Sequence, residues 1–205
     1  ILKLRENQNI LLLMPASRPQ EIKYILPTFL KTAKKLQLKY PRLVVYISSC
    51  RKVFDEKFRK GLEKYEIKGK VISQQDDSEL MPYIYSLAKI ALCKSGTVNM
   101  ELALYGIPQI IGYRVSRVTA FIARRILNFK VRFISPVNLL MKKLIIPEFV
   151  QKNFNEKKIF YKACRLLDLT SEKAKIKKGY ALLKKELGEE GVVDRAAKEI
   201  INSII

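Results

Sequence analysis

The sequence contains no histidine and no tryptophan, and only three of its 205 residues are cysteines. Without histidine, the chain has no imidazole for general acid–base catalysis and no histidine-ligated metal site. Cys50, Cys93 and Cys164 are far apart and match no metal-binding spacing. We therefore expect buried free thiols, typical of a reducing compartment, and no metal or other cofactor.

Long apolar runs are also absent. The longest, such as residues 10–15, have the length of a strand, whereas a membrane-spanning helix needs roughly 18 apolar residues or more. The first residues, 1–5, lack the apolar core and cleavage site of a signal peptide. The chain starts with Ile1 and not with methionine, so we expect it to be part of a longer protein.

Acidic residues are scarce, since 19 Asp and Glu stand against 40 Lys and Arg, which gives a net charge of +21. Such a charge favours anionic partners: nucleic acid, an anionic membrane surface or a phosphorylated substrate. Charge alone does not choose among them, and a compositional bias of the genome would have the same effect. The hydrophobic fraction of 48 % is ordinary for a globular protein.

Short apolar runs alternate with longer amphipathic ones, which predicts a parallel sheet with helices on both faces. Strands are expected at residues 10–14, 43–47, 70–72, 90–93, 109–113 and 131–134, with helices between them. From residue 147 onward the pattern is wholly helical. We expect a nucleotide-binding domain over residues 1–150 and a helical segment over 151–205, which packs on it or crosses to another domain.

In an open α/β sheet, ligands bind beyond the carboxyl ends of the strands, so the strand-to-helix loops carry the functional hypotheses. The loop of Ser95, Gly96 and Thr97 follows a predicted strand and opens a helix. Gly96 lets the backbone approach a ligand, and the amides that begin the helix suit a phosphate. Glu101, one turn later, is placed to accept hydrogen bonds from ribose hydroxyls. The alternative is an ordinary helix cap with a solvated glutamate.

A second loop, residues 15–18, also lies between a strand and a helix. The planar guanidinium of Arg18 suits a phosphate. Ser17 is predicted to cap the following helix, with Pro19 in its first turn. The alternative is a surface arginine beside a capping serine.

Five blocks of sequence together resemble the C-terminal half of lipid-A-disaccharide synthases. They are LLMPASRPQEI (12–22), SGTVNMELALYGIP (95–108), YRVS (113–116), NLL with IPEFVQ (138–140 and 146–151), and LGEEG with RAA (187–191 and 195–197). The resemblance covers nearly the whole chain in the family's order. One block alone is weak, because many glycosyltransferases share a Ser-Gly-Thr turn with a downstream glutamate.

The resemblance implies an α/β, Rossmann-like parallel sheet that forms the C-terminal half of a two-domain glycosyltransferase of the GT-B type. The family transfers 2,3-diacylglucosamine from UDP-2,3-diacylglucosamine to the 6-hydroxyl of 2,3-diacylglucosamine 1-phosphate, with inversion and release of UDP. The product is the β-1,6-linked lipid A disaccharide. The other half supplies the acceptor side and the general base, so we expect the 205-residue chain alone to be inactive.

By the same resemblance, Ser95, Gly96 and Thr97 would face the diphosphate and Glu101 would hold the ribose. Arg18, next to Ser17 in the substrate pocket, would neutralise the charge that develops on departing UDP. Here Ala16 stands where the family has glycine. If that backbone needed a positive φ, alanine would cost about 1 kcal/mol.

The resemblance also implies that Asn138, Glu148 and Gln151 line the sugar or nucleotide pocket, and that Tyr113 borders the uracil or the cleft. The proline before Asn138, Pro136, is displaced from its usual place in the family's motif. This shift predicts an altered loop geometry at Asn138.

Arg117, Phe121, Arg124 and Arg125 belong to a basic amphipathic helix expected at residues 118–127. Such a helix suits an anionic membrane surface, and the family's substrates are acylated. We therefore expect a cytoplasmic protein, peripheral on the inner face of the inner membrane. The alternative is a sheet-covering helix with a solvated basic face.

Competing hypotheses stay open. One hypothesis is another UDP-sugar enzyme of the same two-domain build, either an epimerase or the cell-wall glycosyltransferase. Epimerases of this kind use histidines in this half, and the chain has none. A degenerate relative without activity is another. A nucleic-acid-binding module is favoured by charge alone, and no such motif is present, so we expect no nucleic-acid partner. The C-terminal helices either fold back across the cleft or exchange with a second subunit, which leaves a homodimer open.

Overall fold

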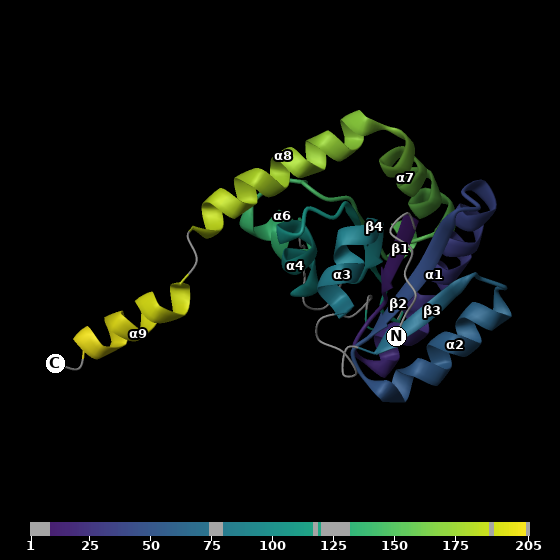
Figure 1. The fold of residues 1–205 in the computed structure, drawn as a ribbon, viewed down its shortest axis with the longest axis horizontal. Helices are drawn as coiled ribbons and strands as arrows, with labels where there is room; N and C mark the ends of the chain where they lie inside the picture. The colour runs from purple at the N-terminus through teal and green to yellow at the C-terminus, as the bar shows by residue number, and fades with distance from the viewer. Residues whose placement is uncertain (1–8, 74–79, 117–118, 120–131, 189–190, 204–205) are drawn as a thin grey trace.

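The computed structural model describes residues 9–73, 80–116, 119, 132–188 and 191–203 of the chain. A six-stranded parallel sheet lies between helices (Figure 1). The strands are β1 (Asn9–Met14), β2 (Leu43–Ser49), β3 (Gly69–Ser73), β4 (Ala88–Cys93), β5 (Gln109–Tyr113) and β6 (Glu148–Val150). The helices are α1 (Pro19–Lys39), α2 (Asp55–Lys64), α3 (Leu80–Leu87), α4 (Val98–Leu104), α6 (Pro136–Leu140), α7 (Glu156–Asp168), α8 (Thr170–Leu187) and α9 (Val192–Asn202), with short 3-10 turns η1 (Lys52–Phe54) and η3 (Gln151–Asn153).

The spatial order of the strands is β3-β2-β1-β4-β5-β6, and the two most apolar strands lie at its centre. Ile10 to Leu13 of β1 and Ile90 to Cys93 of β4 have no exposed surface. Strands that are covered on both faces have continuous apolar runs, as the sequence predicted here. The expected α/β class and parallel sheet are confirmed.

Helices cover both faces of the sheet (Figure 1). Helices α1, α2 and α7 lie on one face, and α3 and α4 lie on the other. Two aromatic pairs join neighbouring elements: Phe29 and Phe154 meet edge to face at 5.5 Å, and Tyr85 and Tyr105 at 5.0 Å. The apolar stripe predicted for the first helix is buried in α1: Ile22, Ile25, Leu26, Phe29, Leu30, Ala33 and Leu36.

The sixth strand is not where the sequence pattern placed it. Residues 132–134 form no strand, residue 131 lies outside the described residues, and β6 is instead Glu148–Val150, paired with the end of β5. Ile134 donates its backbone N–H to the carboxylate of Glu148, at 2.8 Å, and not to a neighbouring strand. The prediction of a wholly helical chain after residue 147 is therefore wrong for these three residues.

Helix α7 packs along α1 and is tied to it at both ends. Lys35 pairs with Glu156 at the start of α7, and Lys39 pairs with Asp168 at its end, at 3.0 Å. Helix α8 then turns across the sheet toward α4. The division into residues 1–150 and 151–205 stays a prediction, although α7 and α8 pack on the sheet domain.

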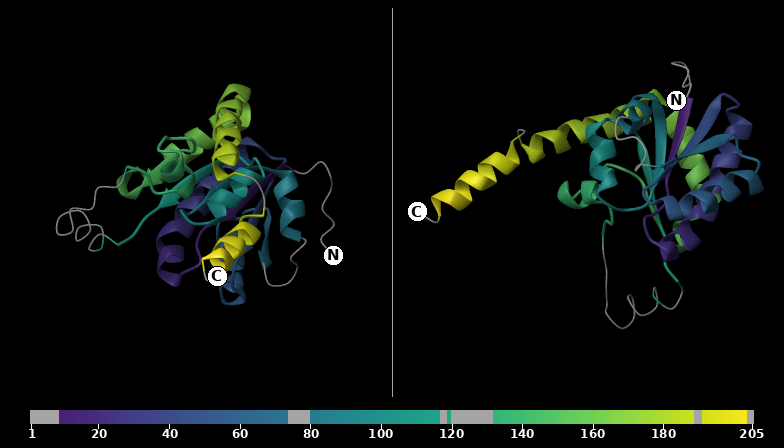
Figure 2. Two further views of the ribbon diagram at one scale, coloured as in Figure 1. Left: turned by 90° about the vertical axis from the view of Figure 1, so that its left-hand side faces the viewer. Right: turned by 60° about the horizontal axis from the view of Figure 1, so that its bottom comes forward.

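Helix α9 extends away from the rest of the molecule in Figure 1 and in the right-hand view of Figure 2. Ile200 and Ile201 on this helix are 60 % and 56 % exposed. The basic helix expected at 118–127 lies, apart from residue 119, outside the described residues. Among the residues that are described, no helix combines the length and apolarity needed to cross a membrane.

Candidate functional site

The two loops that carried the functional hypotheses meet at the centre of the sheet. Strands β1 and β4 are neighbours, and their chain connections lead to opposite sides, which defines the switch point where such sheets bind ligands. Met14 pairs with Cys93, and the Lys94 amide donates to the Met14 carbonyl at 3.0 Å. Residues 15–18, here the arginine loop, and residues 94–97, the glycine loop, are therefore adjacent.

An ion pair joins the glycine loop to the helix that follows the arginine loop. Lys94 Nζ lies 2.8 and 2.9 Å from the two carboxylate oxygens of Glu21, in the first turn of α1. The side chains are only 18 % and 11 % exposed. Neither residue was singled out from the sequence. The sequence feature that could have indicated this ion pair is a lysine immediately before the Ser-Gly-Thr turn together with a glutamate four residues after Ser17.

The arginine loop differs from its prediction in one respect. Arg18, not Ser17, is the N-cap residue of α1, and no side chain caps this helix end. The Ser17 capping prediction is wrong because Pro19 begins the helix one residue later. Ser17 and Arg18 are both exposed, so their side chains can reach a ligand. Ala16 is not among the described residues with a positive φ, so the strain that alanine would cause there does not arise.

The glycine loop is open where a ligand would approach. A Cβ added to Gly96 would meet only Lys94 Cε, at 3.7 Å, and its φ is not left-handed. Nothing in the described protein therefore requires glycine at this position. Among the described residues, no acceptor takes the amides of Thr97 and Val98, which begin α4. An open face with free amides can accept a phosphate group.

Glu101 lies in the first turn of α4, one turn beyond Thr97, and is exposed. Tyr85 of α3 lies beside it. Burial, and then the negative charge of Glu101, raise the pKa of the Tyr85 hydroxyl above its usual range. The Tyr85 hydroxyl therefore stays protonated and interacts with the Glu101 carboxylate, which is exposed and has oxygen lone pairs left for solvent or a ligand.

Asn138 and Glu148 form an internal anchor. Glu148 accepts hydrogen bonds from the Ile134 and Ser135 amides and from Asn138 Nδ2, at 2.7 to 2.9 Å. Asn138 is fully buried, and its Oδ1 accepts from the Ile145 and Ile146 amides. This pair holds the segment that follows the undescribed residues, so any contact with a ligand is a prediction beyond the observed role.

Ser95 joins the glycine loop to the segment that this anchor holds. The Ser95 hydroxyl donates to the Ile134 carbonyl, so it is used inside the protein. Pro136 occupies the first turn of α6, after the N-cap residue Ser135. Proline is favoured there, so its displacement disturbs no helix.

The end of β6 carries a strained residue. Gln151 has a φ of +51°, which is rare for a residue other than glycine, and it directly follows β6. Arg114, one residue after Tyr113, donates to the carbonyls of Gln151 and Phe154 and stacks over the Phe154 ring at 5.1 Å. Tyr113 and Gln151 thus lie at the same sheet edge as the two loops, and strain at such an edge is typical of binding sites.

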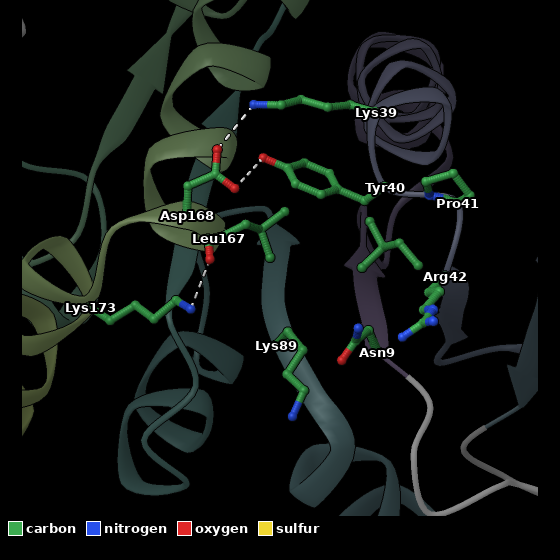
Figure 3. Close-up of a pocket in the computed structure, with 10 residues that line it drawn as sticks. Asn9, Lys39, Tyr40, Pro41, Arg42, Lys89, Leu167, Asp168 and Lys173 are labelled. Atoms are coloured by element: carbon green, nitrogen blue, oxygen red, sulfur yellow. Dashed lines mark hydrogen bonds and ion pairs between the residues drawn. The ribbon is translucent and has the colours of Figure 1, made fainter.

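A cavity of about 710 Å³ lies at the opposite edge of the sheet (Figure 3). Asn9, Leu43 and Lys89, near the starts of their strands, line it, and Tyr40 donates to Asp168 at 2.7 Å in its wall. The amino ends of parallel strands are not where this sheet type binds nucleotides. The site therefore rests on the loops at the switch point and not on this cavity. Arg117, Phe121, Arg124 and Arg125 lie outside the described residues.

Solved structures share the fold at low sequence identity. The C-terminal CMP-Kdo-binding domain of WaaA from Acinetobacter baumannii has a TM-score of 0.57 and 10 % identity, covering 90 % of this chain and 91 % of that one. MurG from the same organism has a TM-score of 0.54 and 11 % identity, covering 87 % of this chain and 46 % of that one. These matches support a Rossmann-like domain of the kind found in two-domain glycosyltransferases.

Sequence relatives are closer. The chain is 44 % identical to the lipid-A-disaccharide synthase of Prochlorococcus marinus, covering 98 % of this chain and 51 % of that protein. It is 34 % identical to the same enzyme of Gloeothece citriformis, covering 99 % and 52 %. The chain thus spans about half the length of these relatives. The lipid-A-disaccharide synthetase family model matches residues 1–204, and the chain therefore belongs to this family.

Proposed function

We propose that this chain is the UDP-sugar-binding half of a lipid-A-disaccharide synthase. One observation carries the proposal: the arginine and glycine loops meet at the switch point of the sheet, with Arg18, Gly96, Thr97 and Glu101 open to a ligand. Family membership supports the choice of ligand. The position of the loops supports its placement.

In this proposal the diphosphate lies over Gly96 and accepts hydrogen bonds from the Thr97 and Val98 amides. Glu101 accepts hydrogen bonds from the two ribose hydroxyls. Arg18, from the neighbouring loop, faces the same diphosphate. Tyr113 and Gln151 border the uracil or sugar, while Ser17 lines the pocket beside Arg18.

The proposed reaction transfers 2,3-diacylglucosamine from UDP to the 6-hydroxyl of 2,3-diacylglucosamine 1-phosphate. The hydroxyl oxygen forms a bond to the anomeric carbon, whose bond to the UDP oxygen breaks, and UDP leaves with the electron pair. Arg18 stabilises the charge that develops on UDP. In this proposal, a base in the part of the enzyme that this chain does not span takes the hydroxyl proton. The chain spans about half the length of its relatives.

Ser95, Asn138 and Glu148 act behind the ligand in this proposal. Their polar groups are bonded to the protein, and together they fix the segment at residues 134–148 against the glycine loop. They are placed to orient the site.

We also propose that the acylated acceptor and the membrane surface meet Arg117, Phe121, Arg124 and Arg125. The net charge of +21 and the apolar substrates favour association with the inner face of the inner membrane. Flotation with anionic and neutral liposomes at low and high salt tests this. Binding that ignores both lipid charge and salt contradicts it.

The main test separates nucleotide recognition from plain attraction of anions to a basic protein. Calorimetric titrations of the chain with UDP, ADP and inorganic pyrophosphate at equal ionic strength compare the three. We expect saturable binding of one UDP, tighter than that of ADP or pyrophosphate. Equal affinities that fall together with added salt would reduce the interaction to charge attraction.

A further inference from the structure

The glycine loop rests on a buried asparagine. Asn99 has no exposed surface, and its Oδ1 accepts a hydrogen bond from the Gly96 amide at 2.9 Å. Its Nδ2 donates to the Lys94 carbonyl at 3.1 Å and to Cys93 Sγ at 3.4 Å. One side chain therefore holds the backbone of the loop at both Lys94 and Gly96.

Asn99 is in turn held by the side-chain amide of a second buried residue, Gln109. Gln109 Nε2 donates to the Asn99 carbonyl at 2.9 Å and to the Tyr180 hydroxyl at 3.0 Å. Gln109 Oε1 accepts from the Cys93 thiol at 3.4 Å. Gln109 is fully buried and Tyr180 is 5 % exposed, so water does not compete for these bonds.

The donor and acceptor of each bond from Tyr180 to Gly96 are determined. The carbonyl of Ile107 can only accept, so the Tyr180 hydroxyl donates to it, at 3.0 Å. That hydroxyl must then accept from Gln109, which fixes the orientation of the Gln109 amide, and its oxygen faces Cys93. Each N–H and O–H from Tyr180 to Gly96 has one acceptor, whereas the Cys93 thiol has two, Gln109 Oε1 at 3.4 Å and the Ile110 carbonyl at 3.9 Å.

Tyr180 comes from α8, which packs unusually close to the body of the protein. At the neighbouring Gly179, an added Cβ would lie 2.3 Å from Ile145 Cγ2. Glycine at this position lets the helix backbone rest against Ile145. The packing of α8 against Ile145 therefore sets the position of the Tyr180 hydroxyl.

We propose that Tyr180 is a positioning residue for nucleotide binding, acting through Gln109 and Asn99 on the Gly96 amide. The docking of α8 thereby sets the shape of the glycine loop. The bonds form one contiguous physical connection of the kind that transmits such an effect. The functional half of this inference rests on the proposed binding of UDP at the loop.

The test compares two single-hydroxyl deletions in the 205-residue chain. Tyr180→Phe removes the bonds to Gln109 and Ile107, whereas Tyr40→Phe removes a hydroxyl bond to Asp168 at the far edge of the sheet. We expect Tyr180→Phe to weaken UDP binding roughly tenfold by calorimetry, well below the melting temperature, because buried groups are left unpaired. Tyr40→Phe should leave UDP affinity unchanged.

The position of the Gly96 amide resonance in an NMR spectrum gives a second measurement that does not depend on UDP. The Gly96 amide resonance should shift in Tyr180→Phe and stay in place in Tyr40→Phe. Gln109→Met, of similar length without the amide, should shift it as well. An unmoved Gly96 resonance in Tyr180→Phe, or equal UDP affinities in the two tyrosine variants, overturns the inference. If the parent binds no UDP, the proposed function fails, and the Gly96 resonance alone decides the coupling.

Discussion

Lys94 and Glu21 form a two-point ion pair across the switch point of the sheet, with Nζ–O distances of 2.8 and 2.9 Å. The pair joins the glycine loop to the helix that follows the arginine loop. Because both side chains are largely buried, removal of one partner leaves an uncompensated charge. The geometry of the site therefore depends on both residues together.

A double-mutant cycle measures this dependence. We expect Lys94→Met and Glu21→Gln each to lower the free energy of unfolding, with a coupling energy of about 1–2 kcal/mol in urea denaturation. The pair of Lys60 and Glu56, 71 % and 65 % exposed, is the matched control. Its coupling should be only about 0.3–0.5 kcal/mol. Equal coupling in the two pairs would contradict a special role for the Lys94–Glu21 pair.

Gly96 is predicted to matter for the ligand and not for folding. Gly96→Ala should keep or slightly raise the free energy of unfolding, by up to about 1 kcal/mol, because the site has room and an ordinary φ. The same substitution should weaken UDP binding roughly tenfold, since the Cβ occupies the proposed diphosphate position.

Gly112 provides the contrast. An added Cβ there would lie 2.1 Å from Phe154 Cε2, so Gly112→Ala should lower the free energy of unfolding by about 1–3 kcal/mol. Paired urea titrations and calorimetry distinguish the two glycines. A destabilised Gly96→Ala variant, or one with parental UDP affinity, would be evidence against an open ligand face.

Asn138 is predicted to be a structural anchor. Asn138→Ala leaves the amides of Ile145 and Ile146 and one donor contact of Glu148 without their partner, which should cost about 2–5 kcal/mol of unfolding free energy. Asn153→Ala removes an exposed contact with Lys158 and should change stability by less than about 0.5 kcal/mol. Similar urea midpoints for the two variants would show that the anchor is unimportant.

The corner between α7 and α8 should respond to acid. Hydrogen bonds from Lys162, then nearby positive charge including that of Arg165, hold the pKa of Glu172 below its ordinary value of 4.5. The resulting stability is fully present above pH 4.5 and is lost as the pH falls through the lowered pKa.

The stability difference between the parent and Glu172→Gln should therefore be constant from pH 7 to about pH 5 and shrink below it. Urea unfolding at stepped pH values measures this difference. A difference that grows as the pH falls would mean that the protonated carboxyl is the stabilising form, against the observed partners.

Much of the fold follows from apolar patterning, because buried parallel strands leave continuous runs that sequence alone reveals. The runs at Ile10–Leu13 and Ile90–Cys93 became the two central strands. The placement of the two loops at one edge followed from the same pattern. The failure at residues 132–134 has a physical cause: the apolar side chains of Phe133 and Ile134 predict burial, whereas a strand needs backbone partners, and the Ile134 N–H donates to the Glu148 carboxylate instead.

Only the residues of the candidate site that are open to a ligand could be predicted from the sequence. Arg18, Gly96 and Glu101 were predicted from loop position and residue type, and their binding of a ligand stays a prediction. The supporting residues were missed because their importance depends on contacts across long sequence distances. Gln109 and Tyr180 are 71 residues apart, and nothing in their local sequence indicates the bond between them.

The most direct test of the nucleotide site is calorimetric titration of UDP into the parent, Glu101→Ala and Glu63→Ala. Both residues are exposed glutamates in helices, so the two variants remove the same charge from similar surroundings. We expect saturable binding to the parent and to Glu63→Ala, and a loss of at least about tenfold, or 1.4 kcal/mol, in Glu101→Ala. Equal affinities in the two variants, or no binding by a folded parent, would contradict a UDP site at the glycine loop.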